Sequence, residues 1–323
     1  MDKISIANLP TKIEKLDLFS NQSVFIKRDD QTGMVTSGNK VRKLEYLLKD
    51  AQNKGCDYLI TSGGIQSNHA RATAAIAAKY HMKSLLILKE SEINKNEGNL
   101  FFNKLVGAEI KLVSEEEYQD LTPIIEEVKK ELTDSGHKPY VIPMGGSNGI
   151  GALGYVEAYD EILHQEEQLG MVFDTIVIAN GSGGTYAGLL YGNKECNKSK
   201  NIIGISVLNQ KKQAAHDILH ILEDMNQYKS SPNSFIENEI NIIDRYIGLG
   251  YGKSQIEELK FIEKFAHEEG IILDPVYTGK AMYGLYHELK NGSLQNSQNV
   301  LFIHTGGIFG WTDEKINMLY GSI

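Results

Sequence analysis

The chain contains very little cysteine. Its 323 residues include only Cys56 and Cys196, too few for the disulfide framework of a small secreted protein or for a cysteine-rich zinc site. The nine histidines are scattered and form no His-Glu-x-x-His pair. Residue spacing therefore gives no support for a metal-dependent mechanism, and we expect no bound metal.

Positive charge and long apolar runs are also lacking. The formal net charge is −9 and the sequence pI is near 5.5, whereas a protein that binds nucleic acid needs a basic face. No apolar run approaches the ~18 residues of a membrane-spanning helix. The first residues show no basic region followed by a long apolar core, so no signal peptide is expected. We expect a cytoplasmic protein whose partners are neither nucleic acid nor membrane.

Short strands and helices alternate along the chain. This order predicts parallel sheets with helical crossovers, that is, an α/β fold. The length suits two domains or one large α/β unit. A polar, helical surface segment is expected over residues 210–241. The predicted strands cover residues 58–61, 84–88, 109–113, 140–143, 174–179, 202–208 and 299–303, and the predicted helices cover residues 68–80, 99–106 and 115–133.

Four glycine-bearing loops follow predicted strands, at residues 62–69, 144–149, 180–185 and 304–307. Ligands of parallel α/β sheets bind outside the carboxyl ends of the strands, so the four loops predict one shared cleft. Glycine that only permits tight turns would explain one or two of these loops. It would not explain why each loop also carries Ser, Thr, Asn or His.

The loop at residues 180–185 is the best phosphate site. Its glycines allow close approach of the backbone, Ser182 and Thr185 add hydroxyl donors, and a helix follows. A Rossmann fingerprint fails because its last glycine is replaced by Tyr186. A Walker motif ending in Gly-Lys-Ser at residues 252–254 fails because its first glycine is replaced by Ile247. A phosphate is expected, without a dinucleotide or a nucleoside triphosphate.

Lys40 follows a Ser-Gly-Asn turn and precedes a predicted helix. A lysine near a helix start is usually solvated, but a lysine amine with a lowered pKa also forms Schiff bases. Arg42 and Lys43 are like-charged neighbours that could lower this pKa. A lysine together with a separate phosphate cradle indicates pyridoxal phosphate, an aldehyde with one phosphate.

Five stretches carry a resemblance to a known family. They look like the D-cysteine desulfhydrase and 1-aminocyclopropane-1-carboxylate (ACC) deaminase family, fold-type II pyridoxal-phosphate enzymes related to the tryptophan synthase β-subunit. The resemblance implies two α/β domains with parallel-rich sheets flanked by helices, a cofactor in the interdomain cleft, and a homodimer. The large domain would comprise residues 1–48 and 162–323, and the small domain residues 49–161. The stretches are residues 37–45, 63–69, 180–188, 274–282 and 302–307.

The same resemblance assigns roles to residues at the cofactor. Lys40 matches the Schiff-base lysine, and Lys43 matches a lysine close to the phosphate. Asn68 matches the asparagine that bonds the phenolic oxygen, and Thr305 is expected to offer its hydroxyl to the ring nitrogen. The matching phosphate loop consists of Gly181, Ser182, Gly183, Gly184 and Thr185.

Other matches concern the substrate. Ser67, with the helix that it begins, matches the group that receives the substrate carboxylate, which agrees with the preference of anions for helix starts. Asn68 and His69 complete this expected substrate site. Tyr277 and Tyr251 match catalytic tyrosines, although most of the 16 tyrosines are expected to be packing residues.

Three positions depart from the ACC deaminase pattern and resemble D-cysteine desulfhydrases instead. They are His69, Thr278 and Thr305, where ACC deaminases typically carry Gln, Glu and Leu. A carboxylate beside the ring nitrogen keeps it protonated and makes the ring a strong electron sink, whereas a hydroxyl leaves a weaker one. A thiol leaves easily as thiolate, because its pKa is ~8.5. The pattern therefore favours β-elimination.

The expected activity is α,β-elimination of D-cysteine to pyruvate, hydrogen sulfide and ammonia, with Lys40 as the general base. The preference for the D form comes from the resemblance alone. ACC deamination and lyase activity on L-cysteate, β-chloro-D-alanine, D-serine or another β-substituted amino acid remain alternatives. A non-catalytic pyridoxal-phosphate carrier is an alternative of another class.

Overall fold

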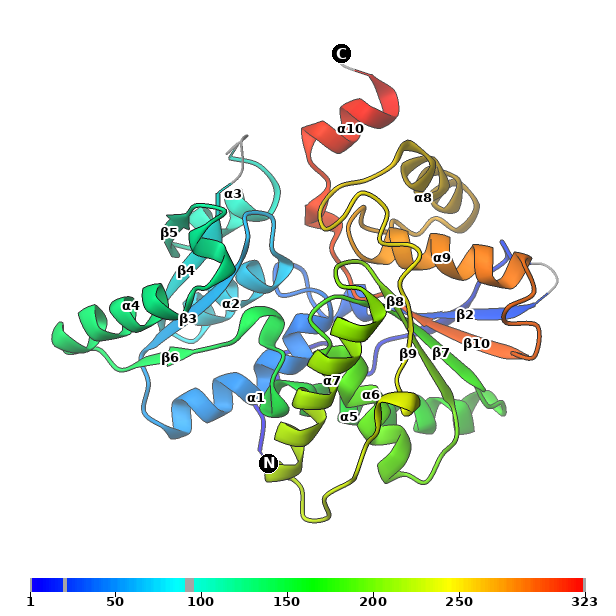
Figure 1. The fold of residues 1–323 in the computed structure, drawn as a ribbon, viewed down its shortest axis with the longest axis horizontal. Helices are drawn as coiled ribbons and strands as arrows, with labels where there is room; N and C mark the ends of the chain where they lie inside the picture. Colours follow the sequence, from blue (N-terminus) through cyan, green and yellow to red (C-terminus); the bar gives the residue numbers. More distant parts are fainter. Residues whose placement is uncertain (1, 20–21, 91–95, 322–323) are drawn as a thin grey trace.

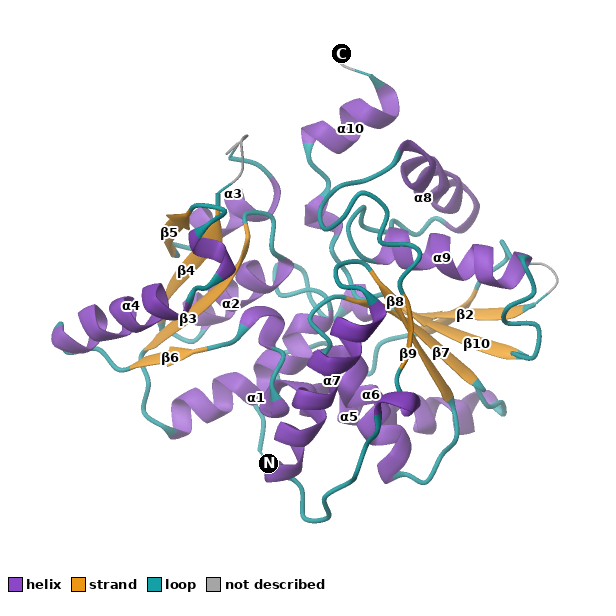
Figure 2. Cartoon of the chain, viewed as in Figure 1, coloured by secondary structure: helices purple, strands orange, loops and turns teal. Residues whose placement is uncertain are grey.

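The computed structural model describes residues 2–19, 22–90 and 96–321 of the chain. Its strands form two separate sheets that stand side by side, each covered by helices (Figures 1 and 2). Nearly all neighbouring strands are parallel, as the alternation of strands and helices predicted. The predicted α/β fold with parallel-rich sheets is confirmed.

Within the described ranges, the larger sheet has six strands in the order β1-β2-β10-β7-β8-β9. Among the strands that the structure describes, only the edge strand β1 runs antiparallel to its neighbour. Strands β7, β8 and β10 confirm the predictions at residues 174–179, 202–208 and 299–303, whereas β1, β2 and β9 were not predicted. The strands are β1 Ile13–Lys15, β2 Ser23–Lys27, β7 Thr175–Asn180, β8 Asn201–Ser206, β9 Asn241–Ile243 and β10 Asn299–Ile303.

Helices cover both faces of the larger sheet (Figure 2). Successive side chains of a strand point to opposite faces. Ile176 and Ile178 therefore pack against α5, α6 and α7, while Val177 and Ala179 pack against α8 and α9. These helices are α5 Gly149–Leu169, α6 Gly184–Glu195, α7 Lys211–Met225, α8 Ile256–Glu269 and α9 Thr278–Lys290, and α10 Asp313–Tyr320 packs on α8.

The smaller sheet, as far as the chain is described, has four parallel strands in the order β5-β4-β3-β6. Leu47 of α1 packs with Leu59 on one face, and Val128 of α4 packs with Ile60 and Ile87 on the other. The elements are β3 Tyr58–Gly64, β4 Lys83–Lys89, β5 Glu109–Val113 and β6 Pro139–Val141, with α1 Asn39–Asn53, α2 Asn68–Lys79, α3 Gly98–Leu105 and α4 Thr122–Asp134.

A buried charge cluster fixes α1 against the larger sheet and α5. Arg42 on α1 lies 2.8 Å from Asp29 and 2.9 Å from Glu161. Burial alone would raise the pKa of Asp29, but the charge of Arg42 lowers it to about 2. The predicted domain boundaries, after residues 48 and 161, fall inside α1 and α5, so the division into domains stays a prediction.

Two sequence predictions need correction. The helix predicted over residues 115–133 begins only at Thr122. The segment at residues 210–241 is helical mainly in its first half, and α7 buries one side of that half, including Ile218 and Leu222, so it is not only surface. In the described residues, no helix combines the length and apolar character needed to cross a bilayer.

Candidate active site

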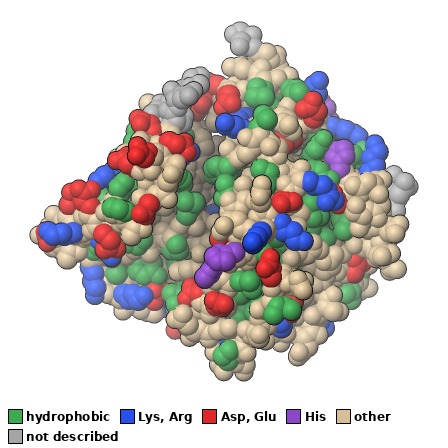
Figure 3. Space-filling model, in the orientation of Figure 1, with side chains coloured by type: hydrophobic (Ala, Val, Ile, Leu, Met, Phe, Trp, Pro, Cys, Tyr) green, Lys and Arg blue, Asp and Glu red, His purple; other side chains and the backbone are tan. Residues whose placement is uncertain are grey.

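A cavity of about 550 Å³ lies where the carboxyl ends of strands from both sheets meet. The surface is hollowed between the two sheets (Figure 3). Residues of all four glycine-bearing loops line the cavity. The cavity also brings together every site residue predicted from the sequence: Lys40, Lys43, Ser67, Asn68, His69, Gly181, Ser182, Gly183, Gly184, Thr185, Tyr251, Tyr277 and Thr305.

Lys40 is the second residue of α1, as the Ser-Gly-Asn turn predicted. The turn residue Gly38 has φ of 93°, and a Cβ there would lie 2.5 Å from the carbonyl oxygen of Thr305. The backbone N–H of Asn39 donates to the same oxygen over 3.1 Å. A side chain at position 38 would therefore push α1 away from the loop after β10, and glycine lets Lys40 reach the cavity.

Burial lowers the pKa of Lys40 to about 8. Among the described residues, its Nζ has a single acceptor, the carbonyl oxygen of Gly145 at a long 3.4 Å. Arg42 is not among the causes of this shift, and its guanidinium pairs with Asp29 and Glu161. The sequence argument named like-charged neighbours as the cause, whereas burial is the main one for Lys40; the repulsion between Lys40 and Lys43 is expressed in the lowered pKa of Lys43.

Lys43 and the start of α6 form an anion cradle. Lys43 is 1% exposed and donates to the carbonyl oxygen of Gly145 over 3.2 Å and to Ser147 Oγ over 3.1 Å. Burial, and secondarily the charge of Lys40, lower its pKa well below the usual value. In the described residues no carboxylate pairs with it. A buried cation without a counter-charge beside a helix N-terminus favours a bound anion.

Glycines keep this cradle open. A Cβ at Gly184 would lie 2.7 Å from Lys43 Nζ and 2.6 Å from Ser147 Oγ. Gly183 caps α6 with φ of 84°, in the left-handed region. Thr185 accepts a hydrogen bond of 2.9 Å from Asn39 Nδ2, which joins the cradle to the start of α1. The space next to the α6 N-terminus therefore fits a phosphate group.

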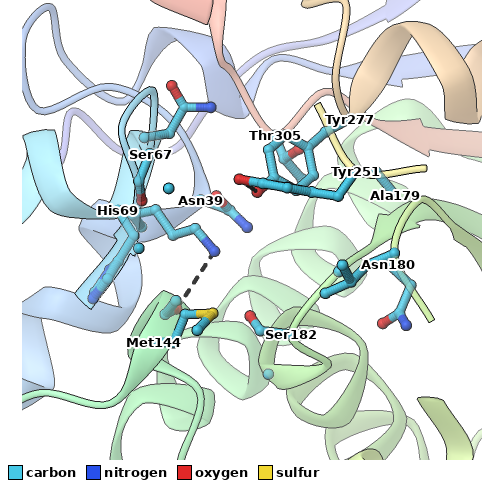
Figure 4. Close-up of a pocket in the computed structure, with 18 of the residues that line it drawn as sticks. Asn39, Ser67, His69, Met144, Ala179, Asn180, Ser182, Tyr251, Tyr277 and Thr305 are labelled. Atoms are coloured by element: carbon cyan, nitrogen blue, oxygen red, sulfur yellow. Dashed lines mark hydrogen bonds between the residues drawn. The ribbon is translucent and has the colours of Figure 1, made fainter. Parts of the chain in front are cut away.

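The start of α2 forms the opposite wall of the cavity. Ser67 is its N-cap, and Ser67 Oγ accepts from the Ala70 N–H over 3.2 Å. A Cβ at Gly63 would lie 2.7 Å from Ser67 Oγ, so glycine is needed for the close return of the chain. Ser67 and His69 face Tyr251, Tyr277 and Thr305 across the cavity (Figure 4). A substrate carboxylate at Ser67 would meet the free N–H groups of α2.

His69 is a neutral group at this wall. Its Nε2 lies 2.9 Å from Thr61 Oγ1, whose own proton goes to the carbonyl oxygen of Ile142 over 2.8 Å. Nε2 therefore carries the ring proton and donates, which leaves Nδ1 as an acceptor. Nδ1 is buried and has no partner in the described part of the chain. Burial, followed by the charges of Lys40 and Lys43, keeps the pKa of His69 well below its usual value.

Tyr277 and Tyr251 form a hydrogen-bonded pair on the far side of the cavity (Figure 4). The Tyr277 hydroxyl donates to Tyr251 Oη over 2.9 Å. Burial raises both pKa values, so both phenols are protonated near neutral pH. Because Tyr251 Oη accepts the hydrogen bond from Tyr277, the O–H of Tyr251 can donate into the cavity.

Thr305 and Thr278 lie differently with respect to the cavity. Thr305 lines the cavity, whereas Thr278 is fully buried outside it. The Thr278 hydroxyl donates to Asp274 Oδ1 over 2.7 Å. Asp274 also accepts from the backbone N–H groups of Thr278, Val276 and Tyr277, so its carboxylate is fully engaged at the start of α9. The expected role of Thr278 beside Thr305 at the ring nitrogen has no support from its position.

Sequence reasoning missed several lining residues. Tyr118 was placed inside the helix predicted over residues 115–133, but it lies in a short 3₁₀ turn and its hydroxyl reaches Met144 Sδ at 3.7 Å. Leu249 and Lys253 alternate with Gly248, Gly250 and Gly252, a pattern that could have marked a binding loop. Among the residues that the structure describes, no group of three or more His, Cys, Asp or Glu side chains is arranged to hold a metal ion.

Together these features define an enzyme of a recognisable class. An amine with a lowered pKa lies beside a phosphate-sized anion cradle, in a cavity between two parallel-rich α/β sheets. This combination fits a cofactor that carries both an aldehyde and a phosphate, because the amine can join the aldehyde while the cradle holds the phosphate.

Comparisons with known proteins agree. A family model described as "Pyridoxal-phosphate dependent enzyme" matches residues 4–306. A putative ACC deaminase of Pyrococcus abyssi is 41% identical over 98% of this chain and 96% of its own. The mitochondrial bifunctional D-cysteine desulfhydrase/ACC deaminase of Arabidopsis thaliana is 41% identical over 97% of this chain and 80% of its own. The crystal structure of an ACC deaminase homologue matches with a TM-score of 0.86 and 39% identity, over 99% of this chain and 97% of that one.

The chain belongs to the pyridoxal-phosphate dependent enzyme family, and within it to the D-cysteine desulfhydrase and ACC deaminase group of lyases. The predicted family, fold type and cofactor are confirmed. The roles of the individual site residues remain predictions that the geometry now makes specific.

Proposed function

We propose that the protein catalyses α,β-elimination of D-cysteine to pyruvate, hydrogen sulfide and ammonia. Bound pyridoxal phosphate supplies the electron withdrawal that makes the substrate α-hydrogen acidic. The observation that carries the proposal is the neutral polar lining of the cavity around Thr305.

The described residues that line the cavity around Thr305 include no carboxylate that could keep a ring nitrogen protonated. Among the described residues that line it, the only acid is Glu115, whose side chain is 74% exposed and pairs with Lys89 over 2.5 Å. Asp274 is fully engaged with its four donors at the start of α9. A ring nitrogen placed against Thr305 would meet a hydroxyl, which favours the unprotonated nitrogen and a weaker electron sink. Such a sink suits a good leaving group, and thiolate is one because the thiol pKa is ~8.5.

The chain's own residues can carry the proton and charge movements. Lys40, with a pKa of about 8, has a neutral fraction at physiological pH and takes the α-proton on Nζ. Ser67 and the start of α2 receive the carboxylate. The Cβ–S bond breaks with its electron pair on sulfur, and the Tyr251 hydroxyl, whose oxygen already accepts from Tyr277, donates its proton to that sulfur. Water then completes the conversion to pyruvate and ammonia.

ACC deaminase activity is the second candidate, because relatives at 41% identity carry that name. Opening a cyclopropane ring demands stronger electron withdrawal than expelling thiolate, and a ring nitrogen against Thr305 offers less of it. L-cysteate, β-chloro-D-alanine and D-serine are further candidate substrates of the same site. We also expect a homodimer located in the cytoplasm.

A substrate panel tests the proposal. The purified protein, loaded with pyridoxal phosphate, is offered D- and L-cysteine, ACC, L-cysteate, β-chloro-D-alanine and D-serine, and keto acid, sulfide and ammonia are measured. We expect D-cysteine to give the highest kcat/KM, with equal amounts of pyruvate and sulfide. A higher kcat/KM for ACC would replace the proposal by the second candidate. A coloured protein that turns over none of these amino acids would support the non-catalytic carrier.

A further inference from the structure

Arg71 on α2 is fully buried one turn after Asn68, and all of its hydrogen-bond partners in the described residues are uncharged. Its Nε donates to the carbonyl oxygen of Val35 over 2.9 Å. Its Nη1 donates to Asn68 Oδ1 over 3.2 Å and to Asn99 Oδ1 over 2.8 Å. Its Nη2 donates to the carbonyl oxygen of Ser37 over 3.1 Å and to Ser37 Oγ over 3.5 Å. All five N–H groups of the guanidinium are therefore engaged.

The charge of Arg71 is not neutralised by a partner. In the described part of the chain no carboxylate pairs with it, in contrast to Arg42, which pairs with both Asp29 and Glu161. The guanidinium carbon lies 4.7 Å from the centroid of the Phe309 ring. Burial lowers the pKa of Arg71 to about 10, so the group stays charged at neutral pH. A buried cation without a counter-ion is costly unless an anion comes close to it.

The hydrogen bonds that link Arg71, Asn99 and Asn68 also fix the orientation of the Asn68 amide. Asn99 Nδ2 donates to the carbonyl oxygen of Gln66 over 2.8 Å and to Asn68 Oδ1 over 3.0 Å. Because Arg71 can only donate and the Gln66 carbonyl can only accept, the Asn99 amide has one orientation. Asn68 Oδ1 then faces two donors. The amide Nδ2 of Asn68, a residue that lines the cavity, is left for a ligand.

We propose that Arg71 is a positioning residue of the active site, which turns the Asn68 amide N–H toward the cofactor and favours the ionised form of the cofactor's phenolic oxygen. The inference rests on the proposed contact between Asn68 and that oxygen. A cation that polarises the amide strengthens its N–H as a donor, and a positive charge nearby favours an anion. In the loaded protein, the phenolic oxygen would share a proton with the nitrogen that joins the cofactor to Lys40. When this oxygen is stabilised as an anion, it attracts that proton less strongly. That nitrogen should lose its proton at lower pH than it would without Arg71.

The pH titration of the visible absorption band of the protein loaded with pyridoxal phosphate tests this role. Arg71→Gln removes the charge, and we expect the midpoint to rise by about one pH unit, a tenfold change in proton affinity. Arg71→Lys keeps a charge and should shift the midpoint less. Asn99→Asp places a carboxylate 2.8 Å from Arg71 Nη1 and removes the Nδ2 donor to Asn68 Oδ1; because it neutralises Arg71 and loosens the Asn68 amide, it should also raise the midpoint. Lys79→Gln removes an exposed charge at the far end of α2 and should leave the midpoint unchanged.

The Asn68→Ala variant separates this inference from the proposed site. If Asn68→Ala leaves the band and its midpoint unchanged, the proposed contact of Asn68 with the cofactor fails. If Asn68→Ala shifts the midpoint but folded Arg71→Gln does not, the role of Arg71 is overturned. Arg71→Gln can also be combined with Asn68→Ala. If Arg71→Gln shifts the midpoint by the same amount with and without Asn68, Arg71 does not act through Asn68, and its proposed role is overturned. Should Arg71→Gln not fold, the unchanged midpoint of Asn99→Asp overturns the inference.

Discussion

Lys40 and Lys43 donate to the same atom, the carbonyl oxygen of Gly145, over 3.4 and 3.2 Å. Two amines one helical turn apart therefore share a single acceptor in a buried site. Each disfavours the charge of the other: the charge of Lys40 contributes to the low pKa of Lys43. An anion bound beside Lys43 would relieve this repulsion, so the phosphate cradle and the reactive amine should be coupled.

The first prediction concerns that cradle. Inorganic phosphate should raise the thermal unfolding midpoint of the cofactor-free protein, because an anion that binds only the folded state stabilises it, by about 2.7 kcal/mol at 100 times its Kd. Lys43→Met should abolish most of this effect and weaken the retention of pyridoxal phosphate about 10- to 100-fold, the worth of a hydrogen bond to a charged group. Scanning calorimetry and equilibrium dialysis provide the two measurements.

Lys54→Met is the matched control for Lys43→Met. Lys54 follows the other end of α1, and its side chain is 57% exposed. Its replacement should leave the phosphate effect intact. If phosphate stabilises the Lys43→Met protein as much as the unaltered protein, the cradle lies elsewhere.

The second prediction follows from the lowered pKa of Lys40. A neutral amine attacks an aldehyde and a protonated amine does not, so the rate at which cofactor-free protein binds pyridoxal phosphate covalently should depend on pH. Since the pKa is about 8, the rate should fall about tenfold per pH unit below it and level off above it. Stopped-flow absorbance of the visible band measures this rate. Lys40→Ala should form no band and no borohydride-fixed peptide, and a modified peptide at another lysine would reassign the reactive amine.

The local chain pattern was enough to predict much of the fold. The strand at residues 109–113 has the predicted bounds, and α2 ends one residue before its predicted end. The predicted helix at residues 115–133 failed at its start, because Ser114 and Glu117 form a reciprocal turn through 2.7 and 3.2 Å bonds. The helix starts instead just before Pro123, which is favoured in a first helical turn. Short strands such as β9, which pairs with β8 on the other side of α7 in the chain, depend on distant partners, so their own residues gave no signal.

The candidate site could be predicted in its members but not in its electrostatics. Strand ends followed by Gly, Ser and Asn predicted which loops meet, since parallel strands bring their carboxyl ends to one edge. The low pKa of Lys40 depends on burial, which no local pattern reveals. The engagement of Arg42 with Asp29, of Thr278 with Asp274 and of Arg71 with Asn99 likewise arises from tertiary packing.

The third prediction separates two tasks of Ser67. As the N-cap of α2, it stabilises the helix, and Ser67→Ala should lower the free energy of unfolding by about 1 kcal/mol. Ser67 is also the proposed receptor of the substrate carboxylate. Ser67→Ala should therefore raise KM about tenfold, with a smaller loss of kcat. Denaturant unfolding and steady-state kinetics with D-cysteine measure the two effects.

Asn148→Ala provides the comparison for Ser67→Ala. Asn148 caps α5 in the same way, accepting from the Gly151 N–H over 2.9 Å, but it is not among the described residues that line the cavity. Its loss should cost similar stability and leave KM nearly unchanged. Equal KM increases in both variants would show that the Ser67 effect is one of folding.

The fourth prediction concerns the tyrosine pair. Because Tyr277 donates to Tyr251, the two hydroxyls should act as a unit on the leaving group. Tyr251→Phe removes the donor that faces the cavity and should lower kcat by about 10²-fold, at the lower end of general acid catalysis. Tyr277→Phe should lower kcat less, because Tyr251 keeps its own proton. The double variant should be no slower than Tyr251→Phe alone, since residues that act as a unit are non-additive.

Independent, multiplying losses of kcat in the two single variants would mean that each hydroxyl meets a different atom of the substrate or cofactor. In that case the 2.9 Å bond between them would matter only for packing.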